Sequence, residues 1–176
     1  MGGTSGSGYA DKVSRPSPAE DRELHGQVAL LLSTRDQRYT AQRRQIVRAL
    51  AKLGRPATIG ELVEAATGVP LSTAYRNLSI LGDADVVRRV GGADGFTRFE
   101  LSEQLSGQHH HHVVCECCGL VIDAATSPTL EAALVETARA IAKANGFDVT
   151  EHRLELVGRC TSCRNTAASE RRKAAT

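Results

Sequence analysis

The sequence predicts an α+β protein of two parts, a winged helix-turn-helix followed by a small α/β domain. Helical segments with capping residues fill the first part and lead into a short glycine-linked β-hairpin. The second part alternates short strands with one long amphipathic helix. It also contains all five cysteines of the chain.

The two parts are expected over residues 25–103 and 104–165. Residues 1–24 are rich in Gly, Ser, Pro and charge, and residues 166–176 are polar and basic. Neither stretch has enough apolar residues to pack a core, so both are expected to be disordered tails, with room for a helix near the end of the first.

In the first part, Thr40, Thr58 and Ser72 are each expected to cap a helix, because their hydroxyls can accept from unpaired N–H groups. A further helix is expected over 25–36. Strands at 86–90 and 96–101 would complete the wing.

In the second part, strands are expected over 110–115, 120–123 and 147–157. Residues 130–145 have apolar side chains at helical spacing, with Pro128 before them and Gly146 after. This pattern predicts one long amphipathic helix.

The net charge of +2 says little about partners. The first part is mildly basic, and the second is acidic and rich in His and Cys. No apolar run is long enough for a membrane span, and the N-terminus lacks a secretory signal, so a cytoplasmic location is expected. In that reducing compartment, cysteines favour metal or redox chemistry over disulfides.

Two C-x-x-C pairs give the strongest chemical signal. Four thiolates suit tetrahedral Zn²⁺, and no position would remain for water, so a structural zinc site is expected. A thioredoxin-type redox motif would occur once, at the start of a helix. Cys117 is expected to be a spectator. The four predicted ligands are Cys115, Cys118, Cys160 and Cys163.

Four successive histidines, His109–His112, lead into a predicted strand. Alternate residues of a strand face opposite sides, so the run can serve two metal sites. With His152 and Glu131, the side chains of His109 and His111 would make an N₃O set suited to Zn²⁺.

The second face of this strand predicts a second, interdomain site. His110 and His112 could reach Glu100 and Asp85, and Asp123 is a further candidate for either site. Taken one at a time, these carboxylates could equally be ordinary surface charges.

The fourth helix of the first part resembles a recognition helix, which reads bases with its N-terminal residues. Arg76 could bond guanine, Tyr75 could pack on a thymine methyl, and Ser72 and Thr73 could bond phosphates. Periodicity alone leaves open a solvated helix with Tyr75 in the core. The arginines expected to bind the DNA backbone are Arg38, Arg43 and Arg44.

Several segments together resemble the ferric-uptake-regulator family over roughly residues 25–165. They are 39–44 (YTAQRR), 72–78 (STAYRNL), 98–101 (RFEL) with the histidine run, 115–119 (CECCG) and 152–163 (HRLELVGRCTSC). The four histidines and two C-x-x-C pairs look closest to the zinc uptake regulators.

The resemblance implies a homodimer that binds a palindromic operator in double-stranded DNA when loaded with metal. It implies a structural Zn²⁺ and one or two regulatory Zn²⁺ per subunit, and repression of genes for zinc uptake and homeostasis. A family member that senses iron, nickel, manganese or peroxide is the alternative. A metallohydrolase is disfavoured because no H-E-x-x-H pattern occurs, and a zinc-storage module would not need Tyr75 and Arg76.

Overall fold

Helix α1 (Pro18–Ser33) starts earlier than the sequence predicts. The Ser17 hydroxyl accepts from the Glu20 N–H and the Glu20 carboxylate accepts from the Ser17 N–H, which is a complete capping box with Pro18 at the first helical position. Residues 18–24 therefore belong to α1, at the end of the predicted tail where the sequence also allowed a helix. Residues 1–16, also assigned to that tail, lie outside the described residues.

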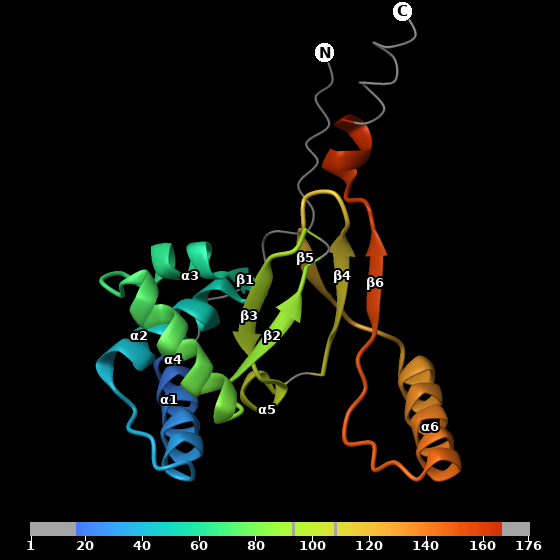
Figure 1. The fold of residues 1–176 in the computed structure, drawn as a ribbon, viewed down its shortest axis with the longest axis horizontal. Coiled ribbons are helices and arrows are strands. Elements are labelled where there is room, and N and C mark those ends of the chain that lie inside the picture. Colours follow the sequence, from blue (N-terminus) through green and yellow to red (C-terminus); the bar gives the residue numbers. More distant parts are fainter. Residues whose placement is uncertain (1–16, 93, 108, 167–176) are drawn as a thin grey trace, which may run out of the picture. The chain divides into compact units, whose positions relative to one another are not determined.

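This computed structural model describes residues 17–92, 94–107 and 109–166 (Figure 1). The chain divides into two compact units. One comprises Met1–Arg88 and Phe99–Leu105, and the other Arg89–Arg98 and Ser106–Thr176. No helix in the described ranges is long and apolar enough to cross a bilayer.

The first unit continues with α2 (Ala41–Leu53), α3 (Ile59–Ala65) and α4 (Leu71–Asp83). Thr40 and Thr58 cap α2 and α3 as predicted. Ser72 does not cap α4. That helix begins one residue before it, with Pro70 extended at the N-cap and no side-chain cap bond. The N–H that Pro70 lacks is one that a helix start leaves unpaired anyway.

The wing strands β2 (Val87–Gly91) and β3 (Thr97–Leu101) form a sheet with the short β1 (Ala57–Thr58), in the order β1-β3-β2. A single turn, α5 (Glu103–Ser106), follows. The sequence predicted the two longer strands within one residue of their ends and missed β1 and α5.

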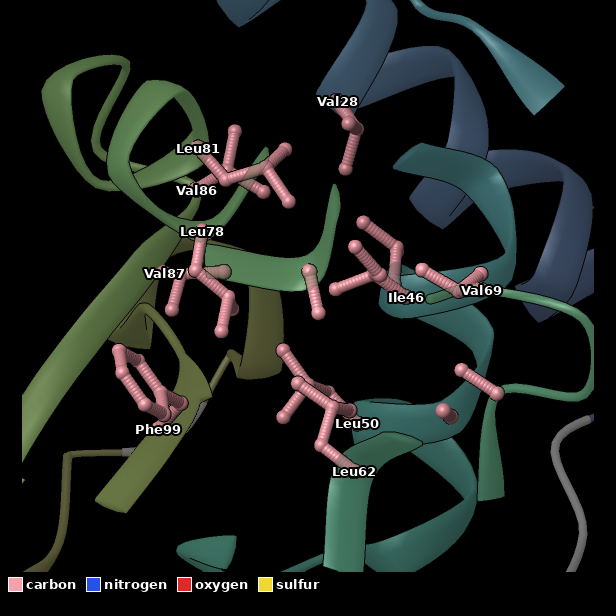
Figure 2. Packing of buried hydrophobic residues seen from close by; sticks show 14 of the residues in the cluster. Val28, Ile46, Leu50, Leu62, Val69, Leu78, Leu81, Val86, Val87 and Phe99 are labelled. Atoms are coloured by element: carbon pink, nitrogen blue, oxygen red, sulfur yellow. The ribbon is translucent and has the colours of Figure 1, made fainter. Parts of the chain in front are cut away.

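Apolar side chains from all four helices and the wing form the core of the first unit (Figure 2). Leu78 brings α4 into this core and is 2% exposed. Burial of the inward face leaves the opposite face of α4 at the surface, as an amphipathic helix requires.

The second unit contains β4 (His111–Cys115), β5 (Val121–Ala124), α6 (Pro128–Asn145) and β6 (Glu155–Gly158). Figure 1 shows β4 between β5 and β6. It runs antiparallel to β5 and parallel to β6. The strand predicted over 147–157 is confirmed only at its end. The register pairs β4 with residues 155–158, and most of the residues before them lie outside the sheet.

We expect Leu78→Ala to destabilise the first unit by about 2–5 kcal/mol, because it leaves a cavity among close-packed side chains. Urea unfolding followed by circular dichroism measures this. Leu71→Ala is the matched control on the same helix, since Leu71 is 51% exposed, and should stay within about 0.5 kcal/mol of wild type. Equal losses in the two variants would contradict this description of the core.

Candidate metal centres and nucleic-acid interface

The four predicted thiol ligands come together at one end of the β5-β4-β6 sheet. Cys115 ends β4, Cys118 lies in the turn after it, and Cys160 and Cys163 follow β6. The parallel register pairs Cys115 with Gly158, which brings the second C-x-x-C beside the first. Their four sulfur atoms all lie within 4.8 Å of one another.

The spacing of these sulfurs fits a tetrahedral zinc ion. Zinc–sulfur bonds of about 2.3 Å place two ligands of a tetrahedron about 3.8 Å apart. The Sγ atoms of Cys118 and Cys160 are 3.8 Å apart. With four thiols and no other group in the set, the cluster has the composition of a closed structural site.

Main-chain N–H groups favour the thiolate form of Cys115. The Cys160 N–H donates to its Sγ at 3.3 Å. This contact and the Cys118 N–H lower the pKa of Cys115 to about 6. Thiol hydrogen bonds raise the pKa of Cys163. One sulfur is thus ready to bind a cation, and the ion itself would displace protons from the others.

Cys117, predicted to be a spectator, is exposed and is not a member of the four-thiol set. It lies between two ligands in the turn after β4.

A second group of metal-binding side chains gathers around α6. His109 precedes β4, His111 begins it, His152 lies before β6, and Glu131 is in the first turn of α6. Each offers one ligand atom, and these atoms lie within 4.8 Å of one another. All four residues were predicted to share a site, and the structure brings all four together.

The distances within this group are also those of a tetrahedral shell. Bonds of about 2.0–2.1 Å to nitrogen and oxygen put neighbouring ligands about 3.4 Å apart. The Nε2 atoms of His109 and His152 are 3.2 Å apart. Glu131 Oε2 lies 3.5 Å from His109 Nε2 and 3.1 Å from His152 Nε2.

Glu131 is held as an anion. The Thr126 hydroxyl donates to Oε1, and His111 and His152 also bond the carboxylate. These contacts, the Thr126 bond first, lower the pKa of Glu131 to about 2. Sequence reasoning missed Thr126, because a single hydroxyl five residues before a carboxylate has no recognisable pattern.

His111 is the buried member of this group, at 2% exposure. The main-chain N–H of Leu154 lies 3.2 Å from its Nδ1 and orients the ring so that Nε2 faces Glu131 at 2.8 Å. Because Nδ1 accepts this bond, a neutral ring carries its proton on Nε2 and directs it at the carboxylate.

The other face of β4 carries His110 and His112, whose ring centroids are 5.2 Å apart. Asp123 on β5 lies opposite His112 in the register, and its Oδ1 is 3.9 Å from His112 Nε2. Asp123, the further candidate in the sequence, therefore lies beside these histidines.

The two carboxylates predicted for the interdomain site belong to the first unit. Asp85 forms an exposed ion pair with Arg35 at 3.3 Å, and it is not among the residues grouped as potential metal ligands. Its left-handed backbone (φ 56°) follows the end of α4. Glu100 is buried on β3. Its participation in a metal site stays a prediction.

The predicted recognition helix presents most of its polar side chains to solvent, and Asn77 is the buried exception. Tyr75 is 56% exposed, so the alternative in which it fills the core is wrong. Ser72 and Arg76 are exposed too, and Thr73 is half-buried. The buried face of α4 is formed instead by Ala74, Leu78 and Leu81.

Arg43 differs from the prediction that it binds the DNA backbone. It is 7% exposed, and its guanidinium donates to Asn77 Oδ1 at 3.0 Å, to Gln37 Oε1 at 3.2 Å and to the Arg38 carbonyl. These bonds tie α2 to α4 from inside. Arg38 is exposed and Arg44 is half-buried at the surface, so both remain candidates.

Comparison with known proteins gives a consistent result. A profile of the Ferric uptake regulator family matches residues 34–157. The Peroxide-responsive repressor PerR of Staphylococcus epidermidis is 30% identical over 148 residues, which cover 82% of this chain and 92% of the relative. Among the solved structures that the fold resembles, two have sequences that are 30% and 32% identical to this chain.

The crystal structure of the Vibrio cholerae ferric uptake regulator has a TM-score of 0.58 and 30% identity, covering 74% of this chain and 98% of that one. A zinc-bound manganese uptake regulator has a TM-score of 0.55 and 32% identity, covering 76% of this chain and 98% of that one.

A winged helix joined to a domain with grouped thiol and imidazole ligands defines a metal-responsive DNA-binding regulator. The chain belongs to the ferric uptake regulator family. Members of this family are transcriptional regulators that bind metal ions, and bind DNA as dimers, and they are not enzymes.

We expect Cys118→Ser to lose one tightly held zinc ion per subunit, because it leaves three thiolates in a site composed of four. Elemental analysis after mild chelation measures the loss. Cys117→Ser is the matched control in the same turn and should retain the wild-type zinc content. A zinc loss in the control but not in Cys118→Ser would contradict the ligand set.

Proposed function

We propose that this chain is a zinc-responsive repressor of genes for zinc uptake and homeostasis, acting in the cytoplasm. The observation that carries the proposal is the group formed by His109, His111, Glu131 and His152. Three imidazoles and one carboxylate at tetrahedral spacing are a ligand set that suits Zn²⁺. His109 is partly exposed, which gives an ion a way in and out.

A regulator that responds to another metal or to peroxide is the second candidate. The relative that is 30% identical is a peroxide-responsive repressor, which supports this reading. The donor set favours zinc over manganese, because manganese prefers oxygen ligands and this group has one carboxylate. Imidazole also suits iron and nickel, so the regulatory metal must be decided by titration.

The cysteine group would hold a second, permanent Zn²⁺. Its four-thiol composition and 3.8 Å sulfur spacing support a structural role. Bound there, the ion would join the chain after β6 to the turn after β4. It would thereby support the sheet that carries the histidines. His110, His112 and Asp123 are candidates for a further regulatory ion, completed by Glu100 in the interdomain prediction.

DNA recognition would use α4. Tyr75 and Arg76 on its exposed face are proposed to contact base edges in the major groove of a palindromic operator, with Ser72 and Thr73 on phosphates. Arg38 and Arg44 would add contacts to the backbone. Arg43 would act indirectly, by holding α4 against α2.

The second unit has an apolar surface suited to homodimerisation. Not one residue of α6 is buried in the single subunit, although the helix carries Val135 and Ile141 at 36% and 55% exposure. Leu156 and Val157 on the edge strand β6 are 52% and 59% exposed. An uncovered edge strand and helix of this kind favour pairing with a second copy.

Metal and DNA would be linked through one conformational equilibrium. If the zinc-loaded dimer favours the arrangement that fits the operator, DNA must in turn favour zinc binding. A coupling of about 1–3 kcal/mol would tighten operator binding roughly 5–150-fold.

We expect Zn²⁺ to activate binding to an operator selected from random duplexes by the zinc-loaded protein, and His152→Ala to lose this response while it keeps the cysteine-bound zinc. A gel-shift titration with buffered Zn²⁺, Fe²⁺, Mn²⁺ and Ni²⁺ measures it. Glu136→Gln, an exposed change on α6 outside the group, should respond as wild type. Activation by Fe²⁺ or Mn²⁺ but not by Zn²⁺ would exclude the zinc proposal.

We expect Tyr75→Ala with Arg76→Ala to weaken operator binding by more than tenfold, since a good base contact contributes about 1–3 kcal/mol of discrimination. Zinc content and unfolding should stay unchanged, because both side chains face solvent. Fluorescence anisotropy with operator and scrambled duplexes measures the effect. Equal binding of the variant and the wild type to the operator would overturn the assignment of α4 as the recognition helix.

A further inference from the structure

A buried histidine in the first unit has no role in the metal sites. His25 on α1 is 5% exposed, and its Nδ1 lies 2.6 Å from the hydroxyl oxygen of Tyr39. Its Nε2 lies 3.4 Å from Asp21 Oδ1, and the other oxygen of that carboxylate is 3.3 Å from Arg48. With Arg44, these residues are called the α1–α2 polar cluster.

A single hydrogen bond joins the imidazole of His25 to the phenol of Tyr39. Burial lowers the pKa of His25 and raises the pKa of Tyr39, so the imidazole is neutral and the phenol keeps its proton at neutral pH. The Asp21 carboxylate lies near Nε2 without a hydrogen bond to it, so the cluster is held at the imidazole by the bond between Nδ1 and the Tyr39 hydroxyl. This bond fixes the phenol ring.

The fixed ring carries a cation on its face. The guanidinium carbon of Arg44 lies 4.7 Å from the centre of the Tyr39 ring, within the range of a cation–π contact. Tyr39 immediately precedes Thr40, the N-cap of α2, and Arg44 is in the first turn of that helix. The ring thus holds the guanidinium beside the helix start.

The donors of Arg44 remain unused. Within the described part of the chain, its guanidinium has no hydrogen bond or ion pair. Its neighbours differ, because Arg43 donates to three internal acceptors and Arg48 pairs with Asp21. An oriented guanidinium with free N–H groups suits a phosphate.

We propose that Tyr39 and His25 are positioning residues that hold Arg44 as a contact to a DNA phosphate. This inference rests on the proposed use of the first unit in DNA binding. His25 fixes the Tyr39 ring, the ring orients Arg44, and Arg44 meets the backbone. Because the contact is to phosphate, it adds affinity without reading sequence.

The test measures salt dependence with the zinc-loaded full chain and a mixed-sequence duplex of about three helical turns. Loss of one phosphate contact lowers the slope of log K against log salt by about 0.9. A dimer loses two such contacts in Arg44→Ala or in Tyr39→Leu, so we expect the slope to fall by about 1.8 for these variants. Raising salt from about 50 to about 200 mM should then weaken these variants about 12-fold less than wild type.

Two further variants separate positioning from folding. Tyr39→Phe keeps the ring under Arg44 and removes only its bond to His25, so it should lose part of the slope. Combined with Arg44→Ala, neither Tyr39 substitution should lower the slope again. Arg48→Ala is the charge-matched control on α2, and it should keep the wild-type slope because its guanidinium is already paired with Asp21.

The outcomes are distinct. A wild-type slope in Arg44→Ala, or an equal slope loss in Arg48→Ala, would overturn the phosphate contact and leave zinc-dependent operator binding intact. Slope losses from Tyr39→Leu that persist without Arg44 would overturn the positioning role. Absence of zinc-dependent DNA binding by the wild type would instead refute the proposed function.

Discussion

The parallel pairing of β6 with β4 is the constraint on which both ligand groups depend. One register sets Cys115 opposite Gly158, beside the second C-x-x-C, and brings His152 to the start of β4. Because side chains alternate along a strand, a slip of one residue between β4 and β6 would change which side chains of the two strands share a face. The main-chain bond from His112 to the Leu154 carbonyl and the bond from Glu116 to the Gly158 carbonyl hold this register at its two ends.

The two groups on this sheet differ in the way their chemistry retains a cation. Four thiols, with main-chain N–H groups already directed at one sulfur, would close around an ion and leave no position for water. The histidine group contains three imidazoles and one carboxylate, and one of its rings is partly exposed. Exchange of a metal ion with solution would be easier from such a shell. A regulator that uses one ion for support and another as a signal would require this difference.

Local periodicity predicted those features that depend on neighbouring residues. Strand alternation gave the division of the four histidines between two faces, and hydroxyl residues marked the starts of α2 and α3. Local periodicity could not predict the features that depend on residues distant in the sequence. Arg43 and Arg44 are neighbours that the sequence does not distinguish, yet Arg43 is buried where it bonds Asn77 on α4. Likewise, Arg35 engages Asp85, and the length of β4 limits that of β6.

The absence of buried residues on α6 has a consequence for how the second unit is held together. A helix with no fully buried residue within its own subunit contributes little to the unfolding free energy of that subunit alone. Its stability would come from whatever covers it, and the covered state is favoured by mass action. Thermal denaturation of the second unit would therefore depend on protein concentration, and dilution would act on this helix as a denaturant does.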